Sequence, residues 1–274
     1  MSMKPTDSSP IGIFDSGIGG MTVVKSVMQE LPGEDIIYFG DTARVPYGTK
    51  SMDTVREYAL QITDFLLKKK VKMILIACNT VAASARQDII AKANGIPVLD
   101  VVLAGAKVAT DQQRKHNLIG VIGTLATVGS GAYEQAISKI NPQIGVFSKA
   151  CPLLVPLAEE GWTENDVAER TVQIYLEDFL QKPLDSLILG CTHYPLFKDT
   201  IRKVINNPDT TIIDSADSIA TMARLHLEST NMLNSKNIGG KFECYVSDKP
   251  QRFQILAERF LGKTINRVEV VNMR

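Results

Sequence analysis

The chain has 274 residues, of which 45% are hydrophobic and 22% are charged, and 30 basic side chains balance 30 acidic ones. This composition is typical of a globular protein of roughly two domains, and it excludes intrinsic disorder, collagen-like repeats and a small disulfide-rich scaffold. The zero net charge and the aromatic content of 6% argue against nucleic acid or an anionic membrane as a partner.

The beginning of the chain gives no sign of export. Residues 1–10 are polar and lack an apolar run, so we expect no signal peptide. The longest apolar stretches, such as 73–78 and 117–123, have the length of strands and fall short of the roughly 18 residues that a membrane-spanning helix needs. We therefore expect a cytoplasmic protein.

Short apolar runs alternate with stretches of helical periodicity along nearly the whole chain. Strands are predicted, in chain order, at 11–15, 35–39, 73–77, 118–123, 144–148, 186–189 and 210–213. The helices predicted between them include 21–31, one with an apolar face from Val55 to Leu66, one that opens with a capping box at 163–166 and runs to about Leu180, and one with an apolar face from Ala216 to Leu227. This alternation predicts βαβ units, mostly parallel sheets and an α/β fold.

Two of the predicted strands end in the same sequence pattern. Residues 74–80 (ILIACNT) and 187–193 (LILGCTH) each run from an apolar strand through a small residue to a cysteine and two polar residues. In parallel α/β sheets, ligands bind at the carboxyl ends of strands, where the next helix presents free N–H groups. The field of that helix is expected to lower the pKa of a cysteine at this place. One such cysteine is often only a small buried apolar residue, but two in matching contexts predict two thiols that serve one site.

The first predicted strand leads into a glycine-rich turn at residues 15–20 (DSGIGG). Its glycines allow a tight turn and the close approach of an anion. A dinucleotide fingerprint would need a third glycine where this sequence has Thr22, so that fingerprint fails. Asp15, which ends the strand, is either a carboxylate satisfied within the turn or a functional group, and both interpretations stay open.

Other residues suited to the same site follow two of these segments. His193 comes two residues after Cys191 and is placed to polarise that thiol or to carry a proton. Residues 46–49 (PYGT) are either a plain turn or a source of hydroxyl and amide groups for a carboxylate ligand. The four cysteines have no CxxC spacing, so we expect free thiols and no metal site; they are Cys78, Cys151, Cys191 and Cys244.

Four of these segments together resemble one enzyme family. Residues 15–20 (DSGIGG), 46–48 (PYG), 78–80 (CNT) and 191–195 (CTHYP) are similar, in order and in register from about residue 11 to 260, to the motifs of the glutamate racemases. That family belongs to the cofactor-independent aspartate/glutamate racemase superfamily. The two cysteine motifs are those of the superfamily, and the other two segments narrow the resemblance to glutamate.

The resemblance implies a two-base mechanism without a cofactor. One thiol removes the α-hydrogen from one face of the amino acid, and the other returns a proton to the opposite face. Cys78 would deprotonate D-glutamate and Cys191 would deprotonate L-glutamate. Asp15 and His193 would adjust the protonation of the neighbouring thiols, with Glu159 as a further carboxylate beside His193. The residues implied to bind the carboxylates and ammonium group of the substrate are Asp15, Ser16, Tyr47, Gly48, Asn79, Thr80, Thr124, Thr192 and His193.

The resemblance also implies the architecture. Two similar α/β domains, with mostly parallel sheets flanked by helices, would be related by an approximate twofold axis, with the active site in the cleft between them. The first domain would hold residues 1–97 plus 211–274, and the second residues 98–210. A homodimer is usual in the family, whose D-glutamate enters bacterial peptidoglycan.

Three rival functions stay open at this point. The first is racemisation of another acidic amino acid, above all aspartate. The second is a nucleotide-dependent oxidoreductase that uses the glycine turn at 17–20. The third is a protein that binds small dicarboxylates without catalysis.

Overall fold

The computed structural model describes residues 8–112, 115–236 and 238–273. Within these residues the chain forms a six-stranded and a four-stranded sheet, and every strand pair is parallel. The six-stranded sheet has the order β10 (Val268–Val270), β9 (Phe242–Val246), β2 (Ile36–Gly40), β1 (Ile11–Asp15), β3 (Met73–Ile76), β4 (Val98–Asp100). The four-stranded sheet has the order β6 (Gly145–Ala150), β5 (Leu118–Gly123), β7 (Ser186–Gly190), β8 (Thr211–Asp214).

The two sheets repeat one strand order. The order β2-β1-β3-β4 in the first sheet corresponds to β6-β5-β7-β8 in the second, while β9 and β10 extend the first sheet beyond β2. In both sheets the chain therefore begins on an inner strand and winds outward in both directions, as in doubly wound folds. The predicted α/β fold with parallel sheets is confirmed. The repeat also makes β3 and β7 equivalent, and these are the strands that precede Cys78 and Cys191.

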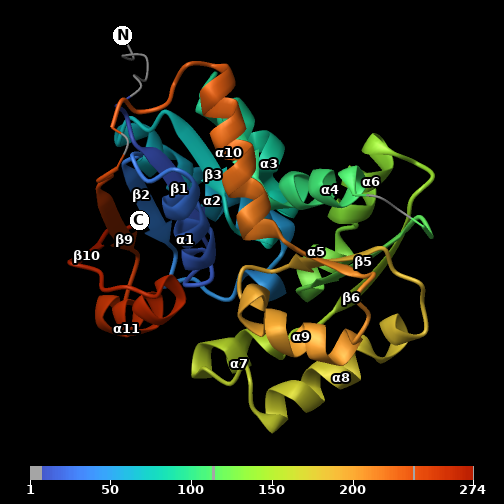
Figure 1. The fold of residues 1–274 in the computed structure, drawn as a ribbon. Coiled ribbons are helices and arrows are strands. Elements are labelled where there is room, and N and C mark those ends of the chain that lie inside the picture. Colours follow the sequence, from blue (N-terminus) through green and yellow to red (C-terminus); the bar gives the residue numbers. More distant parts are fainter. Residues whose placement is uncertain (1–7, 113–114, 237, 274) are drawn as a thin grey trace.

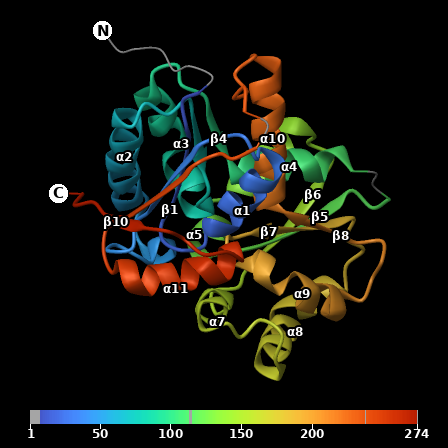
Figure 2. The ribbon, with the colours of Figure 1, turned by 60° about the vertical axis from the view of Figure 1, so that its left-hand side comes forward.

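Helices cover the faces of both sheets, and each sheet with its helices forms one half of the molecule (Figure 1). Two helices join the two halves. Helix α10 packs against α1 and also against α4, so the layers of the two sheets are continuous there. Helix α11 lies near α7 at the opposite end of the junction (Figure 2). The helices and 3₁₀ helices of the described residues are α1 (Met21–Glu30), η1 (Tyr47–Thr49), α2 (Met52–Lys68), α3 (Asn79–Ala93), α4 (Val101–Asp111), α5 (Leu125–Gly129), α6 (Ala132–Ile140), α7 (Leu154–Glu160), α8 (Asp166–Leu180), η2 (Tyr194–Phe197), α9 (Lys198–Ile205), α10 (Ser215–Ser229) and α11 (Pro250–Leu261).

The apolar faces predicted for two helices are buried, but one predicted cap is wrong. On the face predicted for α2, Val55, Ala59, Ile62 and Leu66 are buried, and Tyr58 and Phe65 are half-buried. The face predicted for α10 is buried throughout, at Ala216, Ile219, Ala220, Ala223 and Leu227. Helix α8 is capped by Asn165, whose side-chain oxygen accepts from the backbone N–H of Ala168 at 2.9 Å. Thr163 is therefore not the capping residue, because the helix begins only at Asp166 and the asparagine directly before it has the cap geometry.

The chain changes sheet twice, after β4 and after β8. Both changes fall slightly beyond the expected domain boundaries at 97/98 and 210/211, because 98–100 pairs with the first sheet and 211–214 with the second. We keep the division into two domains as a proposal and, on the pairing of these strands, place its boundaries after Asp100 and Asp214. Among the described helices, none combines the length and apolar character that crossing a bilayer requires.

Candidate active site

A cavity of about 270 Å³ lies between the two halves, and its walls begin where four strands end. Ser16 follows β1, Cys78 follows β3, Thr124 follows β5 and Cys191 follows β7. All of the residues predicted for the site line this cavity except Asp15, which is 1% exposed and lies behind it. The volume is just below the ~300–1,000 Å³ range of drug-sized ligands, so the cavity suits a small metabolite.

On one side of the cavity, Cys78 is buried beside the glycine turn. It lies at the N-terminus of α3 and donates to the hydroxyl of Ser16 at a sulfur–oxygen distance of 3.6 Å. Burial, together with the negative charge of Asp15, raises the pKa of Cys78 to about 12. The expected lowering of the pKa by the helix field is therefore wrong for this cysteine, because removal from water outweighs that field.

Asp15 organises the glycine turn beside Cys78. Its Oδ2 accepts from the backbone N–H groups of Gly17 at 3.2 Å and Gly20 at 3.0 Å, and Tyr38 donates to the carbonyl of Gly17 at 2.7 Å. Burial raises the pKa of Asp15, although His193 and these N–H groups oppose the shift. Because the carboxylate occupies the N–H groups of Gly17 and Gly20, these two groups are not available to a pyrophosphate. This geometry disfavours the rival dinucleotide function.

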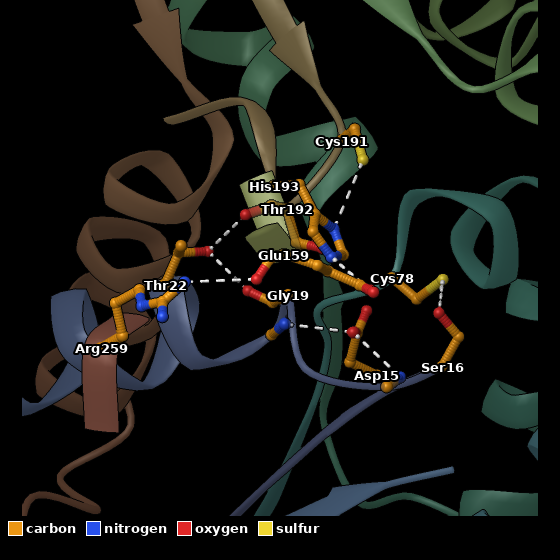
Figure 3. A network of polar contacts seen from close by, with 12 residues as sticks. Asp15, Ser16, Gly19, Thr22, Cys78, Glu159, Cys191, Thr192, His193 and Arg259 are labelled. Atoms are coloured by element: carbon orange, nitrogen blue, oxygen red, sulfur yellow. Dashed lines mark hydrogen bonds and ion pairs between the residues drawn. The ribbon is translucent and has the colours of Figure 1, made fainter. Parts of the chain in front are cut away.

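On the other side of the cavity, Cys191 lies beside a histidine and a glutamate (Figure 3). The Nδ1 atom of His193 is 3.9 Å from the sulfur of Cys191, and its Nε2 atom is 3.3 Å from Oε1 of Glu159. Burial opposes the charged imidazole, but the hydrogen bonds to Cys191 and Glu159 and the charge of Asp15 outweigh it and raise the pKa of His193 to about 10. The hydrogen bond from His193 in turn lowers the pKa of Glu159. The geometry thus places the imidazole of His193 against the sulfur of Cys191, and the raised pKa of His193 favours its charged form there.

Helices of the first half reach across to the turn after β7 and to α7 (Figure 3). Thr22 of α1 donates to the carbonyl of Thr192 at 3.0 Å, and Arg259 of α11 donates to the carbonyl of Glu159 at 3.2 Å. Phe260 of α11 packs edge-on against the ring of His193, with the ring centroids 5.6 Å apart. The position of His193 therefore depends on contacts from both halves of the molecule.

The hydroxyl and amide groups expected to bind substrate are brought together, with one correction. The hydroxyls of Thr80 and Thr124 share a hydrogen bond at 3.3 Å in the wall of the cavity, and Gly48 packs against Thr124. Tyr47 lines the cavity, but its hydroxyl donates to the carboxylate of Asp41 and is not available to a ligand. What Tyr47 and Gly48 can offer is backbone N–H groups, since they begin η1, where a helix has no acceptor of its own for them.

The apolar part of the cavity wall is missing from the sequence prediction. Apart from Ile18 and Pro46, which lie in the predicted segments, it is formed by Val45, Leu125, Pro152, Val155 and Pro156. Leu125 and Pro152 come within two residues of the ends of β5 and β6, so the strand-end rule could have found them, whereas Val155 and Pro156 lie within α7. These side chains keep water away from bound ligand, which strengthens electrostatic interactions inside the cavity.

Replacing Asp15 by asparagine is expected to lower the pKa of Cys78. The substitution keeps an acceptor for Gly17 and Gly20 but removes the negative charge that, after burial, contributes most to the raised value. Because only the thiolate is alkylated, iodoacetamide should modify Cys78 roughly three- to tenfold faster at a pH below 9 in D15N, as measured by peptide mass spectrometry. Cys244, whose pKa burial alone raises to about 12, is the internal control and should keep its rate. An unchanged rate at Cys78 would show that the charge of Asp15 does not reach the thiol.

The four cysteines are all free, as expected.

Comparisons with known proteins agree with the geometry of the cavity. Residues 16–223 match the family model described as Asp/Glu/Hydantoin racemase. The glutamate racemase of Syntrophus aciditrophicus is 48% identical over 273 residues, covering 100% of both chains, and that of Neisseria meningitidis serogroup C is 49% identical over 96% of this chain and 97% of the relative.

A solved structure shows the same fold. The crystal structure of glutamate racemase from Francisella tularensis subsp. tularensis SCHU S4, in complex with D-glutamate, superimposes with a TM-score of 0.90 at 42% identity and covers 97% of this chain and 98% of that one. The glutamate racemase isoform RacE1 from Bacillus anthracis gives a TM-score of 0.92 at 35% identity, with coverage of 97% and 98%. The chain therefore belongs to the Asp/Glu/hydantoin racemase family and, within it, to the glutamate racemases.

Proposed function

We propose that the protein interconverts L-glutamate and D-glutamate by exchanging the α-proton between two thiols. The observation that carries this proposal is the placement of Cys78 and Cys191. They follow equivalent strands of two sheets with the same strand order, and both line one cavity. Two bases on opposite walls are what inversion of a carbon centre requires, because the proton must leave from one face and return to the other.

The proposed reaction needs only groups of this chain and its substrate. In the L-to-D direction the thiolate of Cys191 removes the α-proton, the electron pair of the broken bond moves into the α-carboxylate, and the thiol of Cys78 donates its proton to the opposite face. In the other direction the two cysteines exchange roles. The raised pKa of Cys78 suits it to act as the acid. His193, whose pKa is raised, is placed to stabilise the thiolate of Cys191 with its positive charge. Backbone N–H groups at the start of α3 are placed to stabilise the negative charge that develops on the carboxylate.

Support for glutamate as the substrate comes from relatives. The Francisella enzyme, 42% identical to this chain, binds D-glutamate in its crystal structure. The main alternative is aspartate, which has one methylene fewer and would use the same thiol chemistry. A single methylene is worth only about 10- to 200-fold in discrimination, so the choice between them is a matter for measurement.

Circular dichroism of L-glutamate incubated with the purified protein tests this proposal. We expect the optical signal to decay to zero without added cofactor, in the presence of a chelator, and proton NMR of a parallel sample in deuterated water should show loss of the α-proton signal. L-Aspartate serves as the matched substrate control and should react more slowly. Activity on aspartate alone would keep the mechanism and replace the substrate, whereas no activity on either would contradict the proposal.

The wider role follows from the same proposal. D-Glutamate formed in this way would supply bacterial peptidoglycan synthesis. The enzyme would act in the cytoplasm as a homodimer, without a nucleic acid or membrane partner. The balanced charge of the chain and its four free thiols support this setting, since thiols persist in a reducing compartment.

A further inference from the structure

A buried tyrosine connects the two halves of the molecule directly behind the cavity. Tyr133 lies on α6, in the half built on the second sheet, and is 1% exposed. Its hydroxyl donates to Oδ1 of Asn79, at the start of α3 in the other half, at 2.8 Å. The two residues are 54 positions apart in the sequence, so this contact exists only when the halves are assembled.

The partner of this tyrosine is next to a proposed base. Asn79 directly follows Cys78, lines the cavity and is 3% exposed. Among the described residues its Nδ2 has no hydrogen-bond partner. A buried amide donor without a partner costs free energy, and a ligand group that accepts a hydrogen bond from it would remove that cost. Because the hydroxyl of Tyr133 holds the amide oxygen, the NH₂ group of Asn79 is directed away from the tyrosine.

The ring of Tyr133 contacts the turn of the other proposed base. A Cβ atom placed on Gly190 would come within 3.0 Å of Cε2 of Tyr133, and Gly190 immediately precedes Cys191. Gly105 of α4 leaves room for the ring on another side, at 3.5 Å. The tyrosine therefore touches, with its hydroxyl and its ring edge, the segments that carry Cys78 and Cys191.

The phenol of Tyr133 is a permanent hydrogen-bond donor. Burial is the main cause that raises the pKa of Tyr133 above the ordinary value of a tyrosine, and the charges of Asp100 and Cys191 add to it. The hydroxyl thus keeps its proton over the whole working range of pH, and the amide oxygen of Asn79 is its acceptor throughout.

We propose that Tyr133 is a positioning residue of the racemisation, which orients Asn79 so that its NH₂ group binds a carboxylate of the substrate. This inference rests on the proposed function, because it assigns the unpaired NH₂ group of Asn79 to the glutamate carboxylate. Tyr133 acts through Asn79 and does not itself line the cavity.

The variant Y133F tests this role because it removes the hydroxyl and keeps the ring between Gly190 and Gly105. We expect the KM for L-glutamate and for D-glutamate to rise about tenfold each while kcat changes less than about threefold, since the contact to the carboxylate is made in the ground state and in the transition state alike. The control is Y245F, which removes a hydrogen-bonded tyrosine hydroxyl on β9, away from the cavity, and should leave KM within about twofold.

The double variant separates positioning from general stability. N79A alone should raise KM about tenfold or more, and adding Y133F to it should change KM by less than about twofold, because both act on one contact. Effects that multiply, or an unchanged KM in Y133F with only a lower melting temperature, would overturn the positioning role. A wild-type protein that does not racemise glutamate in the same assay would overturn the proposed function together with this inference, whereas an active wild type with a normal KM in Y133F overturns the inference alone.

Discussion

Racemisation should fall by on the order of 10³-fold or more when either Cys78 or Cys191 is replaced by serine, because inversion needs a base and an acid on opposite faces. The serine hydroxyl fits the space of the thiol but does not ionise in the working range of pH. The remaining cysteine can still remove the α-proton of one enantiomer and return a solvent deuteron to the same face. Circular dichroism measures the loss of inversion, and proton NMR in deuterated water measures the surviving exchange.

The exchange should differ between the two variants. C78S should exchange the α-proton of L-glutamate with retention, and C191S should do the same for D-glutamate, in accordance with the roles proposed for the two thiols. C244A is the matched control, because Cys244 is a buried cysteine on β9 outside the cavity, and it should racemise at the wild-type rate. Racemisation that persists in C78S or C191S would contradict the two-thiol mechanism.

A methyl group added at Gly19 should lower kcat about 100-fold, since displacement of a catalytic group by about 1 Å can have this effect. A Cβ atom there would lie 2.1 Å from Oγ1 of Thr192 and 2.6 Å from Nδ1 of His193. The threonine can rotate away, but the imidazole is held by Glu159 and by Phe260. We therefore expect G19A to displace His193 from Cys191, as measured by steady-state kinetics and by the histidine signals in NMR.

The control for this substitution is G129A. Gly129 ends the short helix α5, and a Cβ atom there would meet no atom within 4 Å, so the variant should keep full activity. Both variants should unfold in a single transition, and their melting temperatures separate loss of the fold from loss of geometry. Full activity in G19A would contradict the prediction, because it would show that the turn after β7 can shift without lowering kcat.

The inner strands were predictable because they are buried on both faces of their sheets. Such strands are continuous apolar runs, and the predicted 11–15 and 118–123 coincide with β1 and β5. The strands that were missed have no such run. β4 and β10 have three residues each, and β9 carries Glu243 within its five residues.

The rule that ligands bind at the ends of parallel strands predicted most of the residues that line the cavity. It could not predict the pKa of each group or the direction of each hydroxyl. The sequence shows that Cys78 begins a helix, yet not that it is buried and close to Asp15, and these two effects decide the direction of its pKa shift. The direction of the Tyr47 hydroxyl depends on Asp41, six residues earlier. Tyr133 has no motif at all, because its partner is 54 residues away and lies in the other half of the molecule.

The surroundings of the two thiols are unequal although the strand order behind them is the same. Cys78 has Asp15 and a serine hydroxyl beside it, whereas Cys191 has an imidazolium and a glutamate. Mirror-image amino acids have equal free energies in water, so the equilibrium lies at equal concentrations and kcat/KM must be the same in both directions. The inequality can therefore appear only as compensation, in which the enantiomer that is turned over more slowly is also the one that saturates the enzyme at lower concentration. In a cell that consumes one enantiomer, this consumption alone sets the direction of the net reaction. The enzyme sets only the concentration at which each enantiomer saturates it.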